Sequence, residues 1–570
     1  MIDLDDERQK LLQTDNHILV LGGPGSGKTT IALCKAKHDI HRLKPFQKIL
    51  FLSFARATVV RVYKQSQGIL SAADLKGIEI STYHAFEWSM LKSNAMLISK
   101  HSISLLPPHE AASSFRGLSG DDLKQAANRE FINSGKLHFD LFAPEAANLL
   151  SQSDSILKLI SDAYPMIILD EFQDTYQDEW NMISLLGKYS TLIALADPEQ
   201  RIYDFRGASP ARVGAYIKLF SPSSFDFGKS NKRSSGTDIV DFGNDLLTGA
   251  NIGKKYHDVS VCQYDEGYQN KNGLIKLKSG LLTIIRRLKE SSPDWSVAIL
   301  TASNSLMIEV SDYLYNSQRF SNEHVLPSIT HNVLIDMTGP TLSAIAIASV
   351  LELGSQCKCS VSNIVDLLEK HISGKNSGKI PKADNTMCDA LIAYLKTGKI
   401  RGKNREKLIS LCKQVADAAN QMIYSGNIID DWKAVRELFN DSNNHFSTLY
   451  RDSFHIRLLR KGSNLYSVLG ELWRTNLNYA GAQAATENAF TQEHFSMDIQ
   501  DSYGVNVMTI HKSKGKEFDV VIIYEEKYKG RILTKPEEVD RARLNLRVAA
   551  TRAKKKTFVL TPRSNPCELL

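Results

Sequence analysis

The most informative stretch of this sequence is Gly22-Gly23-Pro24-Gly25-Ser26-Gly27-Lys28-Thr29, which has the spacing of a phosphate-binding loop. It follows the short β-prone run 17–21 and precedes the helix-like run 30–36. Glycines let backbone N–H groups point at phosphate oxygens, Lys28 can reach the β and γ phosphates, and the Thr29 hydroxyl can ligate Mg²⁺. Strand, loop and helix in this order predict a site for a nucleoside triphosphate. The alternative is a glycine-rich turn that binds no nucleotide.

An acidic element follows the apolar run 164–169, which has the pattern of a buried parallel strand. Such a strand would deliver Asp170 and Glu171 at its carboxyl end. We expect Asp170 to bind Mg²⁺ through water and Glu171 to accept the proton of the attacking water. A solvated acidic turn is the alternative, because further carboxylates crowd the next ten residues. Together with the glycine loop, this element predicts hydrolysis of the triphosphate.

The composition is that of a globular protein of several domains. At 570 residues the chain has room for roughly four domains of ~150 residues. Hydrophobic residues make up 42% and charged residues 23%, which excludes a disordered or fibrous chain. The net charge of +7 permits a polyanionic partner without requiring one. Seven scattered cysteines, an acidic start and no apolar run of membrane length predict a cytoplasmic protein with no membrane partner.

The acidic element continues as Leu169-Asp170-Glu171-Phe172-Gln173-Asp174-Thr175 and resembles the corresponding motif of the UvrD/Rep/PcrA family of superfamily 1 DNA helicases. The other motifs of that family have counterparts in order along the chain, at residues 4–9, 52–57, 81–86, 196–208, 230–235, 507–518 and 548–553. The resemblance implies an α/β fold with two RecA-like P-loop domains in tandem, each with a mainly helical insertion. It also implies ATP between the two cores, single-stranded DNA across them, and movement from 3′ to 5′.

The resemblance assigns roles to residues far from the glycine loop. Gln9 would contact adenine and Glu517 the ribose, with Thr30 beside the base. Gln200 would couple the γ-phosphate to the bound strand, while Arg233 and Arg552 would stabilise the charge that develops during transfer. Residues expected to contact DNA, partly by stacking on bases, are Phe54, Arg56, Tyr83, His84, Tyr203, Phe205, Thr509 and His511. Any one of the aromatic residues could instead belong to a core, and either histidine could satisfy local backbone groups.

Several positions depart from the family pattern. Lys232 stands where the family usually has a tyrosine that stacks on adenine, and Thr30 stands where it often has an arginine on the other face of the base. Phe205 replaces a tryptophan, and Lys516 replaces an apolar residue next to Glu517. We therefore expect weak base discrimination, with use of dATP or other triphosphates.

The motifs divide the chain into four parts. Residues 1–89 and 150–224 are predicted to form the first core around a helical insert, 90–149. Residues 225–352 and 485–570 are predicted to form the second core around another helical insert, 353–484. Within the second insert, the basic segment 396–407 could contact duplex DNA or an acidic partner, or could be a solvated loop. The cysteines there fit no metal-ligand spacing.

The sequence is compatible with two functions. The first is an ATP- and Mg²⁺-dependent translocase on single-stranded DNA or a 3′-tailed duplex. The second is a nucleotide- and DNA-gated regulatory subunit of a nuclease complex that does not unwind DNA. In size and layout the chain also resembles the helicase component of Gabija-type antiphage systems, so that DNA repair and antiviral defence are both open.

Overall fold

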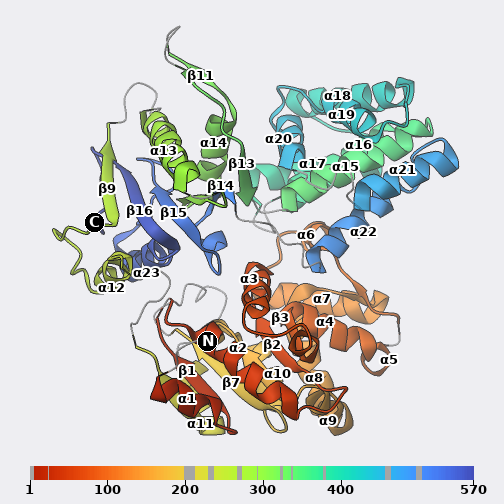
Figure 1. Cartoon of the computed structure of the whole chain (residues 1–570). Helices are drawn as coiled ribbons and strands as arrows, with labels where there is room; N and C mark the ends of the chain where they lie inside the picture. The colour runs from red at the N-terminus through yellow and green to blue at the C-terminus, as the bar shows by residue number, and fades with distance from the viewer. Residues whose placement is uncertain are drawn as a thin grey trace. The chain divides into compact units, whose positions relative to one another are not determined.

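A computed structural model of the chain describes residues 5–23, 25–54, 56–99, 101–197, 212–228, 236–265, 272–291, 293–320, 325–334, 338–375, 380–455, 464–495 and 503–570. The chain forms two compact units (Figure 1). The first comprises Met1–Met90, Ala143–Ile335 and Met497–Leu570, and the second comprises Leu91–Phe142 and Asp336–Ser496.

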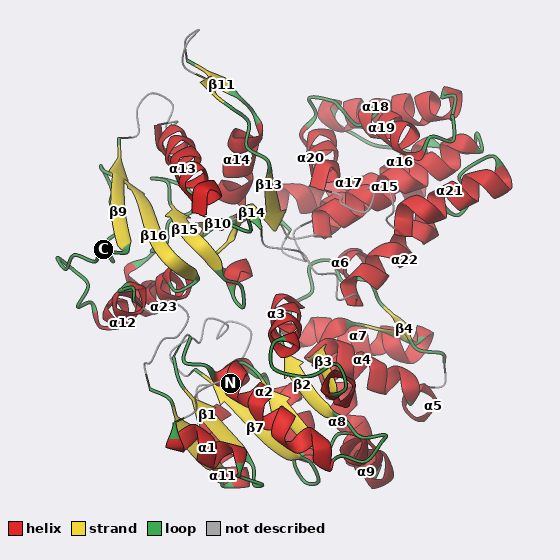
Figure 2. Ribbon diagram, in the orientation of Figure 1, coloured by secondary structure: helices red, strands yellow, loops and turns green. Residues whose placement is uncertain are grey.

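The first unit contains two six-stranded parallel sheets in its described part (Figure 2). The strands of the first sheet, in spatial order, are β3 (Ile78–Thr82), β2 (Ile49–Ser53), β6 (Met166–Leu169), β7 (Thr191–Ala196), β1 (Ile18–Leu21) and β8 (Ser223–Asp226). Those of the second are β13 (His331–Leu334), β14 (Gly504–Thr509), β10 (Ser296–Thr301), β15 (Phe518–Tyr524), β16 (Ala553–Pro562) and β9 (Val259–Tyr264). The predicted α/β class with two parallel-sheet cores is confirmed.

Helices pack against both sheets of this unit. They are α1 (Asp6–Leu12), α2 (Lys28–Asp39), α3 (Arg56–Gln67), α4 (Tyr83–Ser93), α8 (Phe142–Gln152), α9 (Asp154–Ala163), α10 (Gln177–Leu186), α11 (Arg212–Phe220), α12 (Ile239–Thr248), α13 (Asn272–Ser291), α14 (Asn304–Tyr315) and α23 (Val539–Ala550). A small antiparallel hairpin pairs β11 (Gln318–Arg319) with β12 (Val325–Leu326). Inner strands of a parallel sheet that is covered on both faces are buried and mostly apolar, as β2, β6, β10 and β15 are. The edge strands β8, β9 and β13 carry polar and partly exposed residues.

Alternation along β10 shows how the second sheet is buried on both faces. Ala298 and Leu300 join the core that includes α12 and α23, whereas Val297 and Ile299 join the core that includes α13 and α14. Successive side chains of a strand point to opposite faces, so one strand contributes residues to two cores. The loops that follow the strands start at the carboxyl ends of these parallel strands, at one edge of the sheet.

The second unit is mainly helical. Its helices are α5 (Ala95–Ile98), α6 (Pro108–Ser114), α7 (Gly120–Ser134), α15 (Thr338–Ser355), α16 (Val361–Gly374), α17 (Lys382–Thr397), α18 (Lys403–Gln421), α19 (Ile428–Glu437), α20 (Asn444–Asp452), α21 (Asn464–Asn476) and α22 (Ala482–Phe495), with a short pair of strands, β4 (Ser104–Leu105) and β5 (Lys136–Leu137). Helix α15 is apolar on nearly all sides and is buried among its neighbours. An ion pair between Arg116 and Asp389 ties the two stretches of this unit together.

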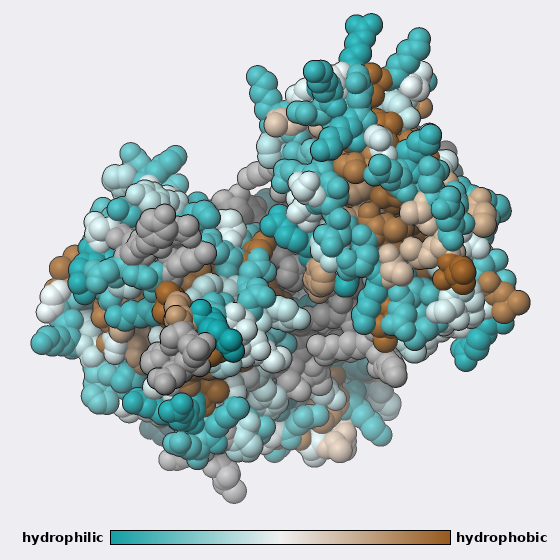
Figure 3. All heavy atoms as spheres, turned by 90° about the horizontal axis from the view of Figure 1, so that it is seen from above, coloured by the Kyte–Doolittle hydropathy of each residue, from teal (hydrophilic) through white to brown (hydrophobic). Residues whose placement is uncertain are grey.

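Both inserts that the sequence predicted contribute to this second unit, while the four-part domain division stays a prediction. Among the described residues, no helix is both long enough and apolar enough to span a membrane. The face drawn in Figure 3 is largely hydrophilic with scattered apolar patches, as expected when most apolar side chains lie in the cores.

Candidate functional site

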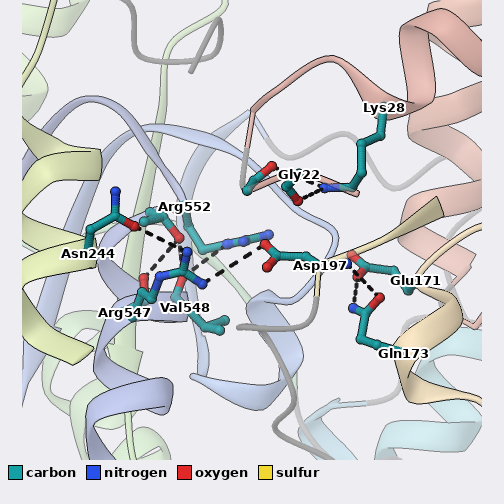
Figure 4. Close-up of polar contacts among 11 residues, drawn as sticks. Gly22, Lys28, Glu171, Gln173, Asp197, Asn244, Arg547, Val548 and Arg552 are labelled. Carbon is teal, nitrogen blue, oxygen red and sulfur yellow. Dashed lines mark hydrogen bonds and ion pairs between the residues drawn. The ribbon is translucent and has the colours of Figure 1, made fainter. Parts of the chain in front are cut away.

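The glycine loop joins β1 to α2 as predicted. Gly27, at φ +90, is in the left-handed region and occupies the N-cap of α2, where it has no side chain to bond the first N–H groups of the helix. Lys28 lies back over the loop, where its Nζ donates to the carbonyl oxygens of Gly22 at 2.6 Å and Gly23 at 3.0 Å (Figure 4). Ser26 Oγ is buried and has no hydrogen-bond partner among the described residues. A glycine-rich loop at the start of a helix, with an ammonium and a buried hydroxyl that no described residue bonds, fits a polyphosphate.

Asp170, the predicted Mg²⁺ ligand, and Glu171, the predicted general base, lie at the carboxyl end of β6. Asp170 is buried and accepts a hydrogen bond from Ser53 Oγ at 3.4 Å. Burial, reinforced by the charge of Glu171, raises the pKa of Asp170. A divalent cation at Asp170 would favour the ionised carboxylate, and carboxylate and hydroxyl oxygens such as those of Asp170 and Thr29 suit Mg²⁺. The chemistry of these donors therefore fits the metal, and the role of both residues stays a prediction.

Glu171 has the opposite electrostatic environment. Burial alone would raise the pKa of its carboxyl, but the positive charges of Lys514 and Lys28, a hydrogen bond from Gln173 and the charge of Arg552 outweigh burial and lower it. Its backbone is left-handed, at φ 53 and ψ 39. This is an uncommon conformation for a residue other than glycine and is often found at functional sites. An ionised carboxylate at this position can orient water or accept a proton.

Gln173 connects Glu171 to the next strand of the sheet, a link that the sequence interpretation missed. Its Nε2 donates to Glu171 Oε2 at 2.6 Å, and its Oε1 accepts the N–H of Asp197 at 3.0 Å (Figure 4). Asp197 directly follows β7 and is the second residue of the stretch 196–208, which the sequence assigned to γ-phosphate coupling. The signal for Gln173 was its place in the acidic motif, two residues after Glu171.

Helix α23 contributes arginines from the second sheet. Arg547 Nη1 lies 4.0 Å from Asp197 Oδ2, and Arg547 Nη2 donates to Asn244 Oδ1 at 3.3 Å. The predicted Arg552 is buried just after the helix, where its Nε donates to Val548 O at 3.0 Å (Figure 4). Sequence reasoning named Arg552 and missed Arg547, which lies five residues earlier, in the last turn of α23.

The loop after β14 contacts the first sheet's loops and helix α3. Lys514 forms a buried ion pair with Asp174, and Glu517, predicted to contact ribose, pairs with Arg61 at 3.1 Å. Gly515 lies between them at φ +77, and a Cβ there would stand 2.1 Å from Thr58 Oγ1. Only glycine permits this close approach.

The predicted DNA-contacting residues divide by burial. Phe54, which is partly exposed, stacks on Tyr83 with ring centroids 4.5 Å apart. Tyr83 is 0% exposed, so the surface on which a base could stack belongs to Phe54 and not to Tyr83. Thr509 is buried at the end of β14, whereas Arg56, His84 and His511 are partly exposed.

Other predicted residues lie apart from these groups or outside the described structure. Thr30 Oγ1 accepts a hydrogen bond from Gln65 Nε2 at 2.6 Å, and Gln9 is on the exposed side of α1. The predicted site residues outside the described ranges are Pro24, Gln200, Tyr203, Phe205 and Arg233. Within the described ranges, no group of three or more His, Cys, Asp or Glu side chains is arranged to hold a metal.

Comparison with known proteins gives the same family along most of the chain. The model of the UvrD/REP helicase N-terminal domain matches residues 4–132 and 121–220, and that of the UvrD-like helicase C-terminal domain matches residues 270–564. The chain is 22% identical to a putative ATP-dependent DNA helicase, YjcD, of Bacillus subtilis, over 91% of this chain and 72% of that protein. It is 20% identical to a probable DNA helicase II homolog of Rickettsia conorii, over 91% of this chain and 86% of that protein. It is also 20% identical to the ATP-dependent DNA helicase PcrA of Staphylococcus aureus, over 42% of this chain and 39% of that protein.

Proposed function

Because this chain belongs to the UvrD-like family of ATP-dependent DNA helicases, we propose that it is a motor that moves 3′ to 5′ along single-stranded DNA, driven by hydrolysis of ATP with Mg²⁺. The observation that carries the proposal is the charge distribution around Glu171. Lys28 from the first sheet and Lys514 and Arg552 from the second all act on this one carboxylate. When side chains from two sheets act on one bound nucleotide, binding or hydrolysis of that nucleotide can change the position of one sheet relative to the other.

Each charged group has a role in the proposed cycle. Lys28 and the loop N–H groups bind the β and γ phosphates, and Thr29 and Asp170 hold the metal, which would supply charge stabilisation at the phosphates. Glu171, held by Gln173, accepts the proton of the attacking water. Arg552 stabilises charge on the γ-phosphate, and we retain Gln200 and Arg233 in the roles that the sequence predicts for them.

DNA binding is proposed for the partly exposed residues near the strand ends. Phe54 offers a stacking surface, and Arg56, His84 and His511 offer contacts to phosphates. Tyr203 and Phe205 stay predicted stacking residues. The four-part domain division and the Gabija-like layout also stay predictions.

Hydrolysis and strand displacement by the purified full chain test the proposal. We expect hydrolysis of ATP to rise at least tenfold with oligo-dT and to be lost in Lys28→Ala, while the exposed-site control Lys10→Ala behaves as wild type. A 3′-tailed duplex should be unwound and a 5′-tailed duplex should not. Equal hydrolysis with and without DNA would overturn the motor. DNA binding and hydrolysis without displacement would instead indicate the gating role.

A further inference from the structure

The order of strands in the first sheet tells which way a bound nucleotide points. Strand β1, which carries the phosphate loop, lies between β7 and β8, and β6 lies beyond β7. Asp170 and Glu171 follow β6. A triphosphate whose γ-phosphate faces these carboxylates must therefore extend its nucleoside toward β8. This step rests on the proposed function, because it assumes that the carboxylates act on the γ-phosphate.

Arg8 lies on the β8 side of the loop and is held there by its neighbours. Its guanidinium stacks 4.3 Å above the ring of Phe227, the residue that follows β8. One of its N–H groups donates to the carbonyl oxygen of Ser26 in the phosphate loop at 3.3 Å. An ion pair with Asp5 holds its other end, and the side chain is 11% exposed. Phe227 is itself tied to β1, since its N–H donates to Leu21 O at 2.9 Å.

The chemistry of a guanidinium restricts which base it can bind. It carries five N–H donors and no acceptor. Among the described residues, Asp5 and Ser26 are the acceptors for its side chain, so N–H groups remain for a ligand. Adenine presents an amine at C6 that needs an acceptor, whereas guanine presents two acceptors, O6 and N7, which match a guanidinium in a bidentate pair.

We propose that Arg8 contacts the O6/N7 edge of the base, so that the site favours 6-oxopurine triphosphates and binds GTP at least as tightly as ATP. Gln9, the next residue, could accept from the adenine amine, but it lies on the exposed side of α1. The proposed base preference thus depends on Arg8, and not Gln9, being the side chain that faces the phosphate loop.

Equilibrium competition binding tests the proposal without relying on turnover. The full-length Glu171→Gln variant, loaded with a fluorescent nucleotide analogue, is competed with ATP, GTP and ITP. We expect GTP and ITP to compete at least as well as ATP, because hypoxanthine keeps O6 and N7 and lacks only the guanine amine. Adding Arg8→Gln should shift the ATP-to-GTP affinity ratio about tenfold toward ATP, since an amide both accepts from the adenine amine and donates to N7. Lys10→Gln on the same helix removes the same charge and should leave the ratio unchanged.

Each outcome decides the matter. ATP binding tenfold tighter than GTP in the Glu171→Gln protein would overturn the proposal, as would an unchanged ratio in Arg8→Gln. Weak ITP with tight GTP would show that the guanine amine, and not the O6/N7 edge, is read. If Arg8→Gln does not fold, the relative affinities of ATP, GTP and ITP for the Glu171→Gln protein still test the proposed preference. Failure of the parent protein to hydrolyse any triphosphate would count against the motor and leave the binding ratios to judge Arg8.

Discussion

Lys514 and Asp174, which are 340 residues apart in the chain, form an ion pair whose side chains are 6% and 2% exposed. The pair joins the loop after β14 of the second sheet to the turn after β6 of the first. It lies near the carboxylate of Glu171, the proposed general base, because Lys514 is also the cation that most lowers the pKa of Glu171 against the opposing effect of burial. One lysine thus contributes both to the contact between loops and to the charge of the site.

Removing Lys514 should destabilise the protein strongly. In Lys514→Ala the Asp174 carboxylate stays buried without its partner, which typically costs about 3–5 kcal/mol. Thermal and denaturant unfolding should show the loss, and the double variant Lys514→Met, Asp174→Asn should recover much of it. Lys529→Ala, which breaks an exposed pair with Glu309 at 3.2 Å, should cost less than about 1 kcal/mol. Equal effects of the two alanine variants would contradict a buried, coupled pair.

Glu171→Gln should separate nucleotide binding from hydrolysis. An amide keeps the size and the contact to Gln173 but cannot accept a proton, so kcat should fall about 10²- to 10⁴-fold. Titration with a fluorescent nucleotide analogue should give an affinity within a few-fold of wild type. Glu309→Gln, which alters an exposed carboxylate paired with Lys529, is the matched control. A residual kcat within threefold of wild type would assign the general base elsewhere.

Phe54→Ala should weaken binding of single-stranded DNA. One lost stacking contact is worth ~1–3 kcal/mol, so the dissociation constant for oligo-dT should rise at least fivefold. Fluorescence anisotropy at constant salt measures it. Tyr83→Phe keeps the ring that supports Phe54 and should leave the affinity unchanged. If Phe54→Ala binds as wild type does, Phe54 serves packing against Tyr83 and Tyr176 alone.

Stability should fall with rising pH through Glu179. Burial raises its pKa to about 8, although its carboxylate accepts the N–H of Tyr176. The unfolded carboxyl titrates near pH 4.3, at about its reference value, so between these pH values the folded state holds a proton that the unfolded state has lost. This contribution is fully present below the lower value and is lost as the pH rises to the upper one.

Thermal melts at pH 5.5 and 8.5 test this contribution. The decrease in Tm between the two should be smaller in Glu179→Gln than in wild type, because the amide cannot ionise and its oxygen still accepts from Tyr176. Glu7→Gln changes an exposed carboxylate on α1 and should follow the wild-type curve. Parallel curves for wild type and Glu179→Gln would show that the buried carboxyl is not protonated.

Local patterns in the sequence predicted the strands that carry the site. The runs 17–21, 164–169, 296–300 and 518–523 correspond to β1, β6, β10 and β15, with ends displaced by at most two residues. Strands buried on both faces are continuous apolar runs, and the glycine loop has a spacing that backbone geometry dictates. Both signals are local, which is why they can be read without the rest of the chain.

By itself, the sequence determined that a glycine loop and an acidic turn follow parallel strands, and that motifs resembling those of the helicase family follow in order. Only the tertiary structure decided which charges meet: Lys514 with Asp174, Arg547 with Asp197, and Arg8 rather than Gln9 against the phosphate loop. The reason is physical, since strand and loop formation depends on neighbouring residues, whereas an ion pair or an aromatic stack depends on how distant segments pack and on which face of a short helix is buried.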